Sequence, residues 1–118
     1  MRLTGFVKKA WGHENIWCSN DKYCGKLLQF NTGTKFSMHF HKDKDETWYV
    51  INGVFEVSYI DTKTAEVRSV TLMSGDVWRN EPCEPHQLKC LQEGTIIEVS
   101  TPDSVEDNYR VFPGDSQK

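Results

Sequence analysis

The chain has 118 residues, of which 37% are hydrophobic and 26% charged, and its formal net charge is −3. This length is enough for one domain with a sizeable core and too short for two. Its lysines are interleaved with acidic residues and no basic block occurs, so nucleic acid is not an expected partner.

Ten short runs rich in β-branched and aromatic residues predict strands, and little of the chain has helical character. In chain order these runs are Phe6–Trp11, Ile16–Cys18, Tyr23–Phe30, Lys35–His41, Thr47–Ile51, Val54–Ile60, Glu66–Leu72, Val77–Arg79, His86–Leu91 and Thr95–Ser100. Many short strands at this spacing predict an all-β protein, either an antiparallel β-barrel or a double-sheet jelly roll.

Turn residues separate the predicted strands. Asn52-Gly53 predicts a two-residue hairpin because both positions tolerate positive φ, and a second hairpin is expected around Ser74-Gly75. After Pro102 the chain becomes acidic and then polar. Residues 103–118 are therefore expected to form a tail with a frayed end, which leaves a core of about residues 5–101 within one domain, 1–118.

Hydropathy and cysteine usage bear on location. The N-terminus begins Met1, Arg2, Leu3 and continues polar, and no apolar run reaches the length of a signal peptide or a membrane span. We therefore expect a cytoplasmic protein with no membrane partner. The four cysteines show no C-x-x-C spacing and are expected to be reduced and mostly buried: Cys18, Cys24, Cys83 and Cys90.

Three histidines and a glutamate have the spacing of a metal site. His39 and His41 alternate on one predicted strand, so they point to the same face. Glu46 follows a polar connector that can turn the chain back, and His86 comes from a second segment. A lone strand histidine is more often a surface or hydrogen-bonded core residue, but four ionisable groups inside a purely structural barrel would destabilise it.

The predicted site is one divalent metal ion bound by four side chains, His39, His41, Glu46 and His86. Imidazole and carboxylate suit zinc, manganese, iron, nickel or cobalt, and the absence of a thiolate argues against a structural zinc site. Cys83 and Cys90 flank His86, so either thiol could approach the metal, although buried thiols are ordinarily packing residues.

The same residues resemble the motifs of the cupin superfamily. The first cupin motif is matched at every fixed position, by Gly33, His39, His41, Glu46 and Gly53. The second motif is kept in part, with Gly75, Pro82 and His86 in place and other residues at three positions, Glu81, Cys83 and Cys90. The resemblance implies a small β-barrel, also called a double-stranded β-helix, that holds a metal near one mouth.

Flanking phrases are similar to the cupin domain of type II mannose-6-phosphate isomerases over nearly the whole chain. The similar phrases are Lys9–Glu14, Glu46–Gly53 and Ile96–Pro102. This resemblance implies that Arg110 in the closing segment contacts a substrate phosphate. His39 stands where those isomerases generally carry glutamine, so the choice of metal is not implied. Arg110 lies one residue nearer the preceding acidic pair than in the family phrase, and with both departures the resemblance implies the fold but not the whole reaction.

An isomerase needs a base beside its metal. An open metal position can polarise a substrate carbonyl and the neighbouring hydroxyl, and a second ionisable group then moves a proton between the two carbons. Glu81 and Lys26 are the candidates in this sequence, although such residues on turns and strand edges are more often solvated charges.

Aromatic residues are numerous and have two interpretations. Sugars stack on such rings, and Trp48, which shares strand parity with Glu46, is expected to face the interior as a substrate contact; filling of the core is the commoner role. Tyr49 and Ile51 have the opposite parity and should face outward. If the outward set forms a continuous patch, the protein is expected to be a homodimer, as the cupin resemblance also implies.

Three function classes remain open from the sequence. The first is an enzyme that acts on a small carbohydrate or sugar phosphate, favoured by the flanking phrases. The second is a metal-dependent dioxygenase or lyase that acts on another small molecule, favoured by the three histidines, which leave open positions on an iron ion. The third is a non-catalytic metal-binding or sugar-binding cupin, favoured by the small size and the lack of a clear base.

Overall fold

The structure, a computed structural model, describes residues 5–118. The polar opening Met1–Thr4, which the sequence analysis used against a signal peptide, lies outside the described residues. The elements are β1 (Gly5–Lys9), β2 (Gly12–Ser19), β3 (Cys24–Phe30), β4 (Met38–Phe40), β5 (Glu46–Ile60), β6 (Val67–Leu72), β7 (Val77–Asn80), β8 (His86–Ser100), β9 (Tyr109–Phe112) and the 3-10 helix η1 (Asp115–Gln117). Within residues 5–118, no helix is long and apolar enough to cross a membrane.

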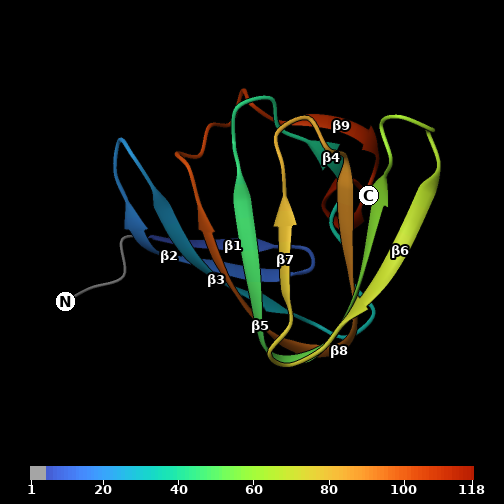
Figure 1. Ribbon diagram of the computed structural model, residues 1–118. Coiled ribbons are helices and arrows are strands. Elements are labelled where there is room, and N and C mark those ends of the chain that lie inside the picture. Colours follow the sequence, from blue (N-terminus) through green and yellow to red (C-terminus); the bar gives the residue numbers. More distant parts are fainter. Residues whose placement is uncertain (1–4) are drawn as a thin grey trace.

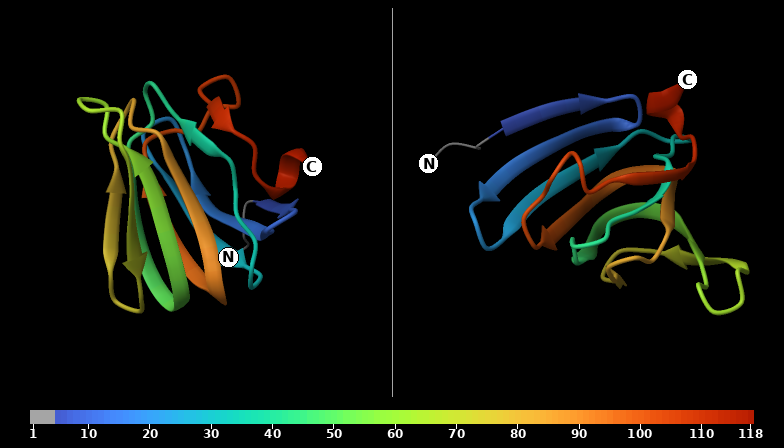
Figure 2. Two further views of the ribbon diagram at one scale, coloured as in Figure 1. Left: turned by 90° about the vertical axis from the view of Figure 1, so that its right-hand side faces the viewer. Right: turned by 90° about the horizontal axis from the view of Figure 1, so that it is seen from above.

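The strands form one antiparallel sheet that curls on itself (Figures 1 and 2). β1, β2, β3 and β8 are neighbours in that order, and β8 also pairs with β4 and β5. β5 in turn pairs with β6 along one half and with β7 along the other. The predicted all-β architecture of the cupin type is therefore confirmed.

The predicted hairpin at Asn52-Gly53 is wrong. β5 runs through these residues as one strand of 15 residues, and β8 runs through Gly94 in the same way. The register between the two strands shifts here, and Gly53 has a φ of 88°. The positive φ that favours a hairpin serves a bulge instead, where the two backbones approach so closely that a Cβ on Gly53 would lie 2.7 Å from the Cα of Gly94.

These bulges bend β5 and β8 at the closed end of the sheet, so both ends of each strand lie at its open end (Figure 1). Glu46, the first residue of β5, pairs with Ser100 at the end of β8, and Tyr59 near the end of β5 pairs with His86 at the start of β8. The bend therefore brings Glu46 and His86, which lie 40 positions apart in the sequence, to one end of the fold.

Ser74-Gly75 does form a turn, but the predicted hairpin there is also wrong. β6 and β7 on either side of the turn pair with consecutive stretches of β5 and not with each other. The N–H of Asp76 donates to the carbonyl of Met73 at 2.9 Å, which closes the turn. The predicted turn is therefore present, but the bend in β5 makes β6 and β7 pair with β5 and not with each other.

The closed end of the sheet holds the apolar core. Trp11 stacks on Phe30 with ring centroids 4.3 Å apart, and Phe55 meets the edge of Phe30 at 5.3 Å. The predicted parity of β5 is confirmed, because Trp48 is buried and Tyr49 is exposed. The remaining members of the cluster are Leu28, Val50, Val57, Leu72, Leu88, Cys90 and Ile96.

The C-terminal segment is more ordered than the predicted tail. β9 pairs with β4 in antiparallel register, with Arg110 opposite His39. Farther on, the carboxylate of Asp115 accepts a hydrogen bond from the N–H of Lys35 at 2.8 Å, and η1 covers the last residues. β9 is not predicted by the sequence, because its partner, β4, lies about 70 positions earlier and has only three residues.

Candidate metal centre

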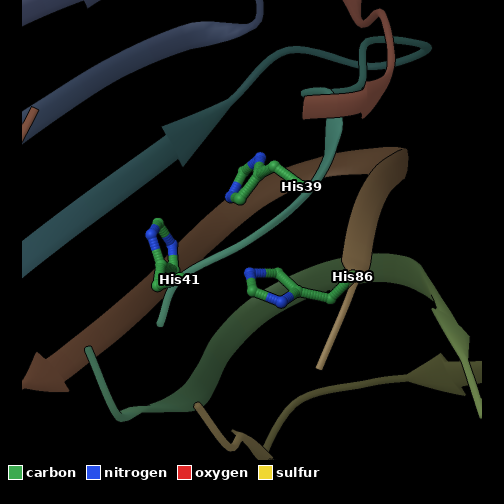
Figure 3. Close-up of side chains that lie close together, drawn as sticks. All are labelled: His39, His41 and His86. Atoms are coloured by element: carbon green, nitrogen blue, oxygen red, sulfur yellow. The ribbon is translucent and has the colours of Figure 1, made fainter. Parts of the chain in front are cut away.

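Three imidazole rings meet at the open end of the sheet (Figure 3). His39 lies on β4, His41 directly follows that strand, and His86 begins β8. β4 and β8 pair at His39 and His86, so the two side chains are cross-strand neighbours. One nitrogen of each ring lies within 4.8 Å of those of the other two, near enough for the three to share one ion.

Hydrogen bonds on the far side of each ring orient the imidazoles. The Nδ1 of His41 lies 2.6 Å from the carbonyl oxygen of Asp107, and the Nδ1 of His86 lies 2.9 Å from that of Glu84. A carbonyl only accepts, so both Nδ1 atoms carry the hydrogen and both Nε2 atoms keep a lone pair. The Nδ1 of His39 lies 2.9 Å from the hydroxyl oxygen of Ser37, which fits the same tautomer.

The residues present fit a metal ion. The Nε2 of His86 is buried and has no hydrogen-bond partner within residues 5–118, although Glu46 Oε1 lies 3.0 Å away. A buried polar atom without a partner is costly, and a metal ion on the Nε2 lone pair would satisfy it. Burial, followed by the neighbouring rings of His86 and His41, lowers the pKa of His39 to about 3, so this ring is neutral, as a ligand must be.

Glu46, the predicted carboxylate ligand, lies beside the imidazoles. Its Oε1 is 3.0 Å from Nε2 of His86 and 3.6 Å from Nε2 of His41. Burial alone would raise the pKa of Glu46, but contacts with His86 and Glu98 and the charge of Lys44 hold it well below its usual value. The triad of His39, His41 and His86 is thus the centre of a divalent metal site, and the ligand role of Glu46 stays a prediction.

A cavity of about 310 Å³ opens from this centre. Three other predicted site residues line it, namely Lys26 from β3, Trp48 from β5 and Arg110 from β9. Trp48 is fully buried, and its ring centroid lies 5.7 Å from that of His86. Glu81 does not line the cavity; its exposed carboxylate pairs with Arg79 at 3.2 Å. Its role as a base stays a prediction.

Neither thiol that flanks His86 lines the cavity. Cys83 is exposed, and its contribution is a backbone N–H that donates to the carbonyl of His41 at 2.6 Å. Cys90 belongs to the apolar core, where burial raises its pKa to about 11. Neither sulfur belongs to the group of close ligand atoms that the three histidines form.

Two buried charged residues of the cavity, Glu98 and Lys44, were not predicted as site residues from the sequence. Glu98 on β8 receives a hydrogen bond from Trp48 Nε1 at 3.1 Å, and its Oε2 lies 3.2 Å from Nζ of Lys44. Burial, and then the charge of Glu46, raises the pKa of Glu98 to about 8. One signal was available for Glu98, which shares strand parity with buried Ile96 and so had to face inward.

The model of the cupin domain family matches residues 26–100, which span every element from β3 to β8. The chain belongs to the cupin domain family. No curated protein matches the sequence.

Solved structures with this fold include proteins of different kinds. Oxalate decarboxylase from Bacillus subtilis matches with a TM-score of 0.78 and 20% identity over 92% of this chain, which spans 30% of that chain. KdgF from a Halomonas species matches with a TM-score of 0.67 and 22% identity over 80% of this chain and 81% of that chain. An RmlC-like cupin from Shewanella frigidimarina matches with a TM-score of 0.72 and 20% identity over 87% of both chains. These likenesses support the cupin fold and not the narrower resemblance to mannose-6-phosphate isomerases.

Proposed function

We propose that this protein is a metal-dependent cupin enzyme that acts on a small carbohydrate or sugar phosphate. The observation that carries the proposal is a cavity of about 310 Å³ beside three converging imidazoles, two of which, His39 and His41, line it together with many charged side chains. A divalent ion bound there would act as a Lewis acid toward substrate oxygens. The volume of the cavity suits a small ligand, and its charged lining suits one with many oxygen atoms.

The cationic side chains of the cavity are suited to holding an anionic group. Lys26 is buried beside acidic neighbours, and although burial alone would lower its pKa, Glu98 and the other carboxylates raise it above its usual value. A lysine that stays protonated is a poor base and a good anion contact, so we assign Lys26 to binding. Arg110 lines the cavity from β9 and has an exposed side chain, as a contact for an incoming phosphate requires.

Glu98 is our candidate for proton transfer in place of Glu81. Its carboxyl group lines the cavity and contacts Glu46, which in turn touches His86. A general base must lie within reach of a substrate held at the metal. The position of Glu98 in the cavity lining supports this role, and Glu81 lies outside that lining. A buried carboxyl group in this position also favours a catalyst over a protein that only binds metal or sugar.

A metal-dependent dioxygenase or lyase is the second candidate. Three imidazoles with few other protein ligands leave open positions on an iron ion, which supports this class.

The test begins with the metal content of protein purified without added metal. Metal-loaded protein is then incubated with a panel of aldose and ketose phosphates, and exchange of the C2 proton with deuterated solvent is followed by NMR. We expect exchange with at least one sugar, its loss in Glu98→Gln with metal content unchanged, and its retention in Glu81→Gln.

Two results would contradict the proposal. If proton exchange were lost in Glu81→Gln and kept in Glu98→Gln, Glu81 and not Glu98 would be the base. No exchange with any sugar, together with oxygen consumption on another substrate, would move the protein to the dioxygenase class.

A further inference from the structure

Two buried lysines outside the metal centre point at one carboxylate. Lys26 Nζ lies 2.7 Å from Oδ2 of Asp103, and Lys44 Nζ lies 3.2 Å from Oδ1 of the same residue. Each oxygen of the carboxylate therefore has its own ammonium group. The lysine side chains are 5% and 6% exposed, whereas the side chain of Asp103 is 42% exposed.

The lysines and Asp103 belong to parts of the fold that differ in exposure. Lys26 is fixed on β3 in the middle of the sheet, and Lys44 lies in the loop that ends at the first residue of β5. Asp103 belongs to the irregular segment between β8 and β9, which crosses the mouth of the cavity. The two lysines are thus buried in the lining of the cavity, whereas Asp103 reaches them from the solvent-exposed segment.

The segment that carries Asp103 is held at both ends by other contacts. At one end, Thr101 and Asp45 exchange two hydrogen bonds, both of 3.0 Å. At the other, the carboxylate of Asp107 accepts hydrogen bonds from the backbone N–H groups of residues 42–44, the shortest at 2.6 Å. Between these anchors Val105 is 93% exposed. Asp103 can therefore turn outward without releasing either end.

Charge balance favours an anion in this position. The cavity lining carries four cationic side chains and four acidic ones, namely Lys9, Lys26, Lys44 and Arg110, and Glu14, Glu46, Glu98 and Asp103. A divalent ion at the imidazoles makes the whole lining positive. Without the carboxylate of Asp103, Lys26 would keep Glu14 at 3.5 Å and Lys44 would keep Glu98 at 3.2 Å, but the two buried ammonium groups would lose the one carboxylate that they share. A second carboxylate in that position would restore this contact.

We propose that Lys26 and Lys44 form a carboxylate-binding subsite, which Asp103 occupies in this structure and which a carboxylate of the substrate takes by displacing it. The inference rests on the proposed function, because it places this group beside the metal centre, with only Glu46 between. Lys44 Nζ lies 3.7 Å from Oε2 of Glu46, whose Oε1 faces the imidazoles. The substrate class is then a small acid with hydroxyl or carbonyl oxygens, such as a sugar acid.

The test uses metal-free protein, so that its outcome does not depend on metal chemistry. Glycolate, a small hydroxy acid, is titrated by calorimetry into wild type and Asp103→Asn, with its neutral amide as the matched ligand. We expect glycolate to bind Asp103→Asn at least about tenfold more tightly than wild type, because no internal carboxylate has to leave two charged hydrogen bonds. The amide should show no such gain.

Matched variants isolate the subsite. Glu106→Gln makes the same change of charge in the same segment, but Glu106 accepts a hydrogen bond from the Ser104 hydroxyl and does not line the cavity, so glycolate affinity should stay at the wild-type value. Lys44→Met added to Asp103→Asn should remove the gain, whereas Lys42→Met, from the same loop but exposed, should keep it. An equal gain for the amide, or no gain for glycolate, would overturn the proposal.

A measurement on the wild type covers the case in which Asp103→Asn does not fold. Saturating glycolate should shift the side-chain ammonium NMR signals of Lys26 and Lys44 and leave that of Lys42 in place. Inorganic phosphate is the competing probe. If phosphate shifts the two signals and glycolate does not, the subsite is not one for carboxylates; if neither does, there is no anion subsite. Metal content measured on the purified protein before its metal is removed reports on the proposed function separately.

Discussion

The closed and open ends of the curled sheet are built from the same two strands and have opposite interiors. At the closed end, β5 and β8 bury Phe55 and Ile96 among apolar side chains; at the open end the same strands bury Glu46, His86 and Glu98. The inward parity is continuous, so the strand geometry does not distinguish the two ends. The two ends differ in how their buried side chains are stabilised. Dispersion contacts act at the closed end, and paired charges with a metal site act at the open end.

The comparison predicts that stability resides mainly at the closed end. Phe55→Ala removes a fully buried ring that packs on Phe30, and we expect a loss of about 3–5 kcal/mol in the free energy of unfolding, measured in urea. Val70→Ala, at an exposed position of the neighbouring strand β6, should cost less than about 1 kcal/mol. Equal losses would mean that the apolar cluster is not the main source of stability.

The bend that joins the two ends can be tested with a pair of glycines. Gly53 and Gly33 both have positive φ, but a Cβ on Gly53 would meet Gly94, whereas one on Gly33 would meet nothing within 4 Å. We expect Gly33→Ala to cost about 1–2 kcal/mol, the strain of positive φ alone. Gly53→Ala should cost about 1–3 kcal/mol more because of overpacking. Thermal unfolding of both variants measures these losses. Similar losses of stability would show that the close approach of Gly53 to Gly94 is unimportant.

At the open end, a substitution should remove metal and leave the fold. His41→Ala deletes one imidazole of the triad, and we expect metal content, measured by mass spectrometry after dialysis, to fall from one ion per chain to none. The loss of stability in metal-free protein should be about 1 kcal/mol. His13→Ala is the control, because His13 stacks on Phe6 away from the site. Retention of one ion per chain in His41→Ala would refute the site.

Acid should act first on the open end. His39 is held neutral in the folded state by a pKa of about 3, against 6.5 in the unfolded chain. Between these values the unfolded state binds a proton that the folded state does not, so the stability of metal-free protein should fall as pH is lowered from about 6.5 toward about 3. Urea unfolding of His39→Gln should show a flatter dependence over that window. Identical slopes would show that His39 does not contribute.

The smallest effect is expected on the outer face, where we propose a contact with a second copy of the chain. Tyr49 pairs with Val77 on one side and with Ile97 on the other, and Val99 is exposed next along β8, which makes a continuous apolar surface. Tyr49→Lys should halve the mass in sedimentation equilibrium while metal content stays unchanged. A wild type that remains monomeric at high concentration would refute the homodimer.

The metal triad could be predicted from the sequence because its geometry is mostly local. Alternation on one strand places His39 and His41 on one face whatever the rest of the fold does. His86 came from a motif spacing within one segment. The inward direction of Trp48 and the outward direction of Tyr49 followed from the same alternation, and the structure confirms them.

Pairing partners could not be obtained in this way. Asn52-Gly53 has the chemistry of a hairpin turn and of a bulge alike, and only the opposing Gly94 decides between them. β9 was missed because a short exposed strand has no pattern of its own and depends on β4 for its hydrogen bonds.

The sequence by itself determined the all-β class, the inward faces of the strands and the three imidazoles, because each depends on residue type and on a period of two. Only the tertiary structure decided that Lys26, Lys44 and Asp103 meet, and that Glu98 rather than Glu81 lies in the cavity. These residues come from segments 18 to 77 positions apart, joined by the bend in β5 and β8 and by the segment after β8. A charge on a strand carries no local sign of which distant charge will neutralise it.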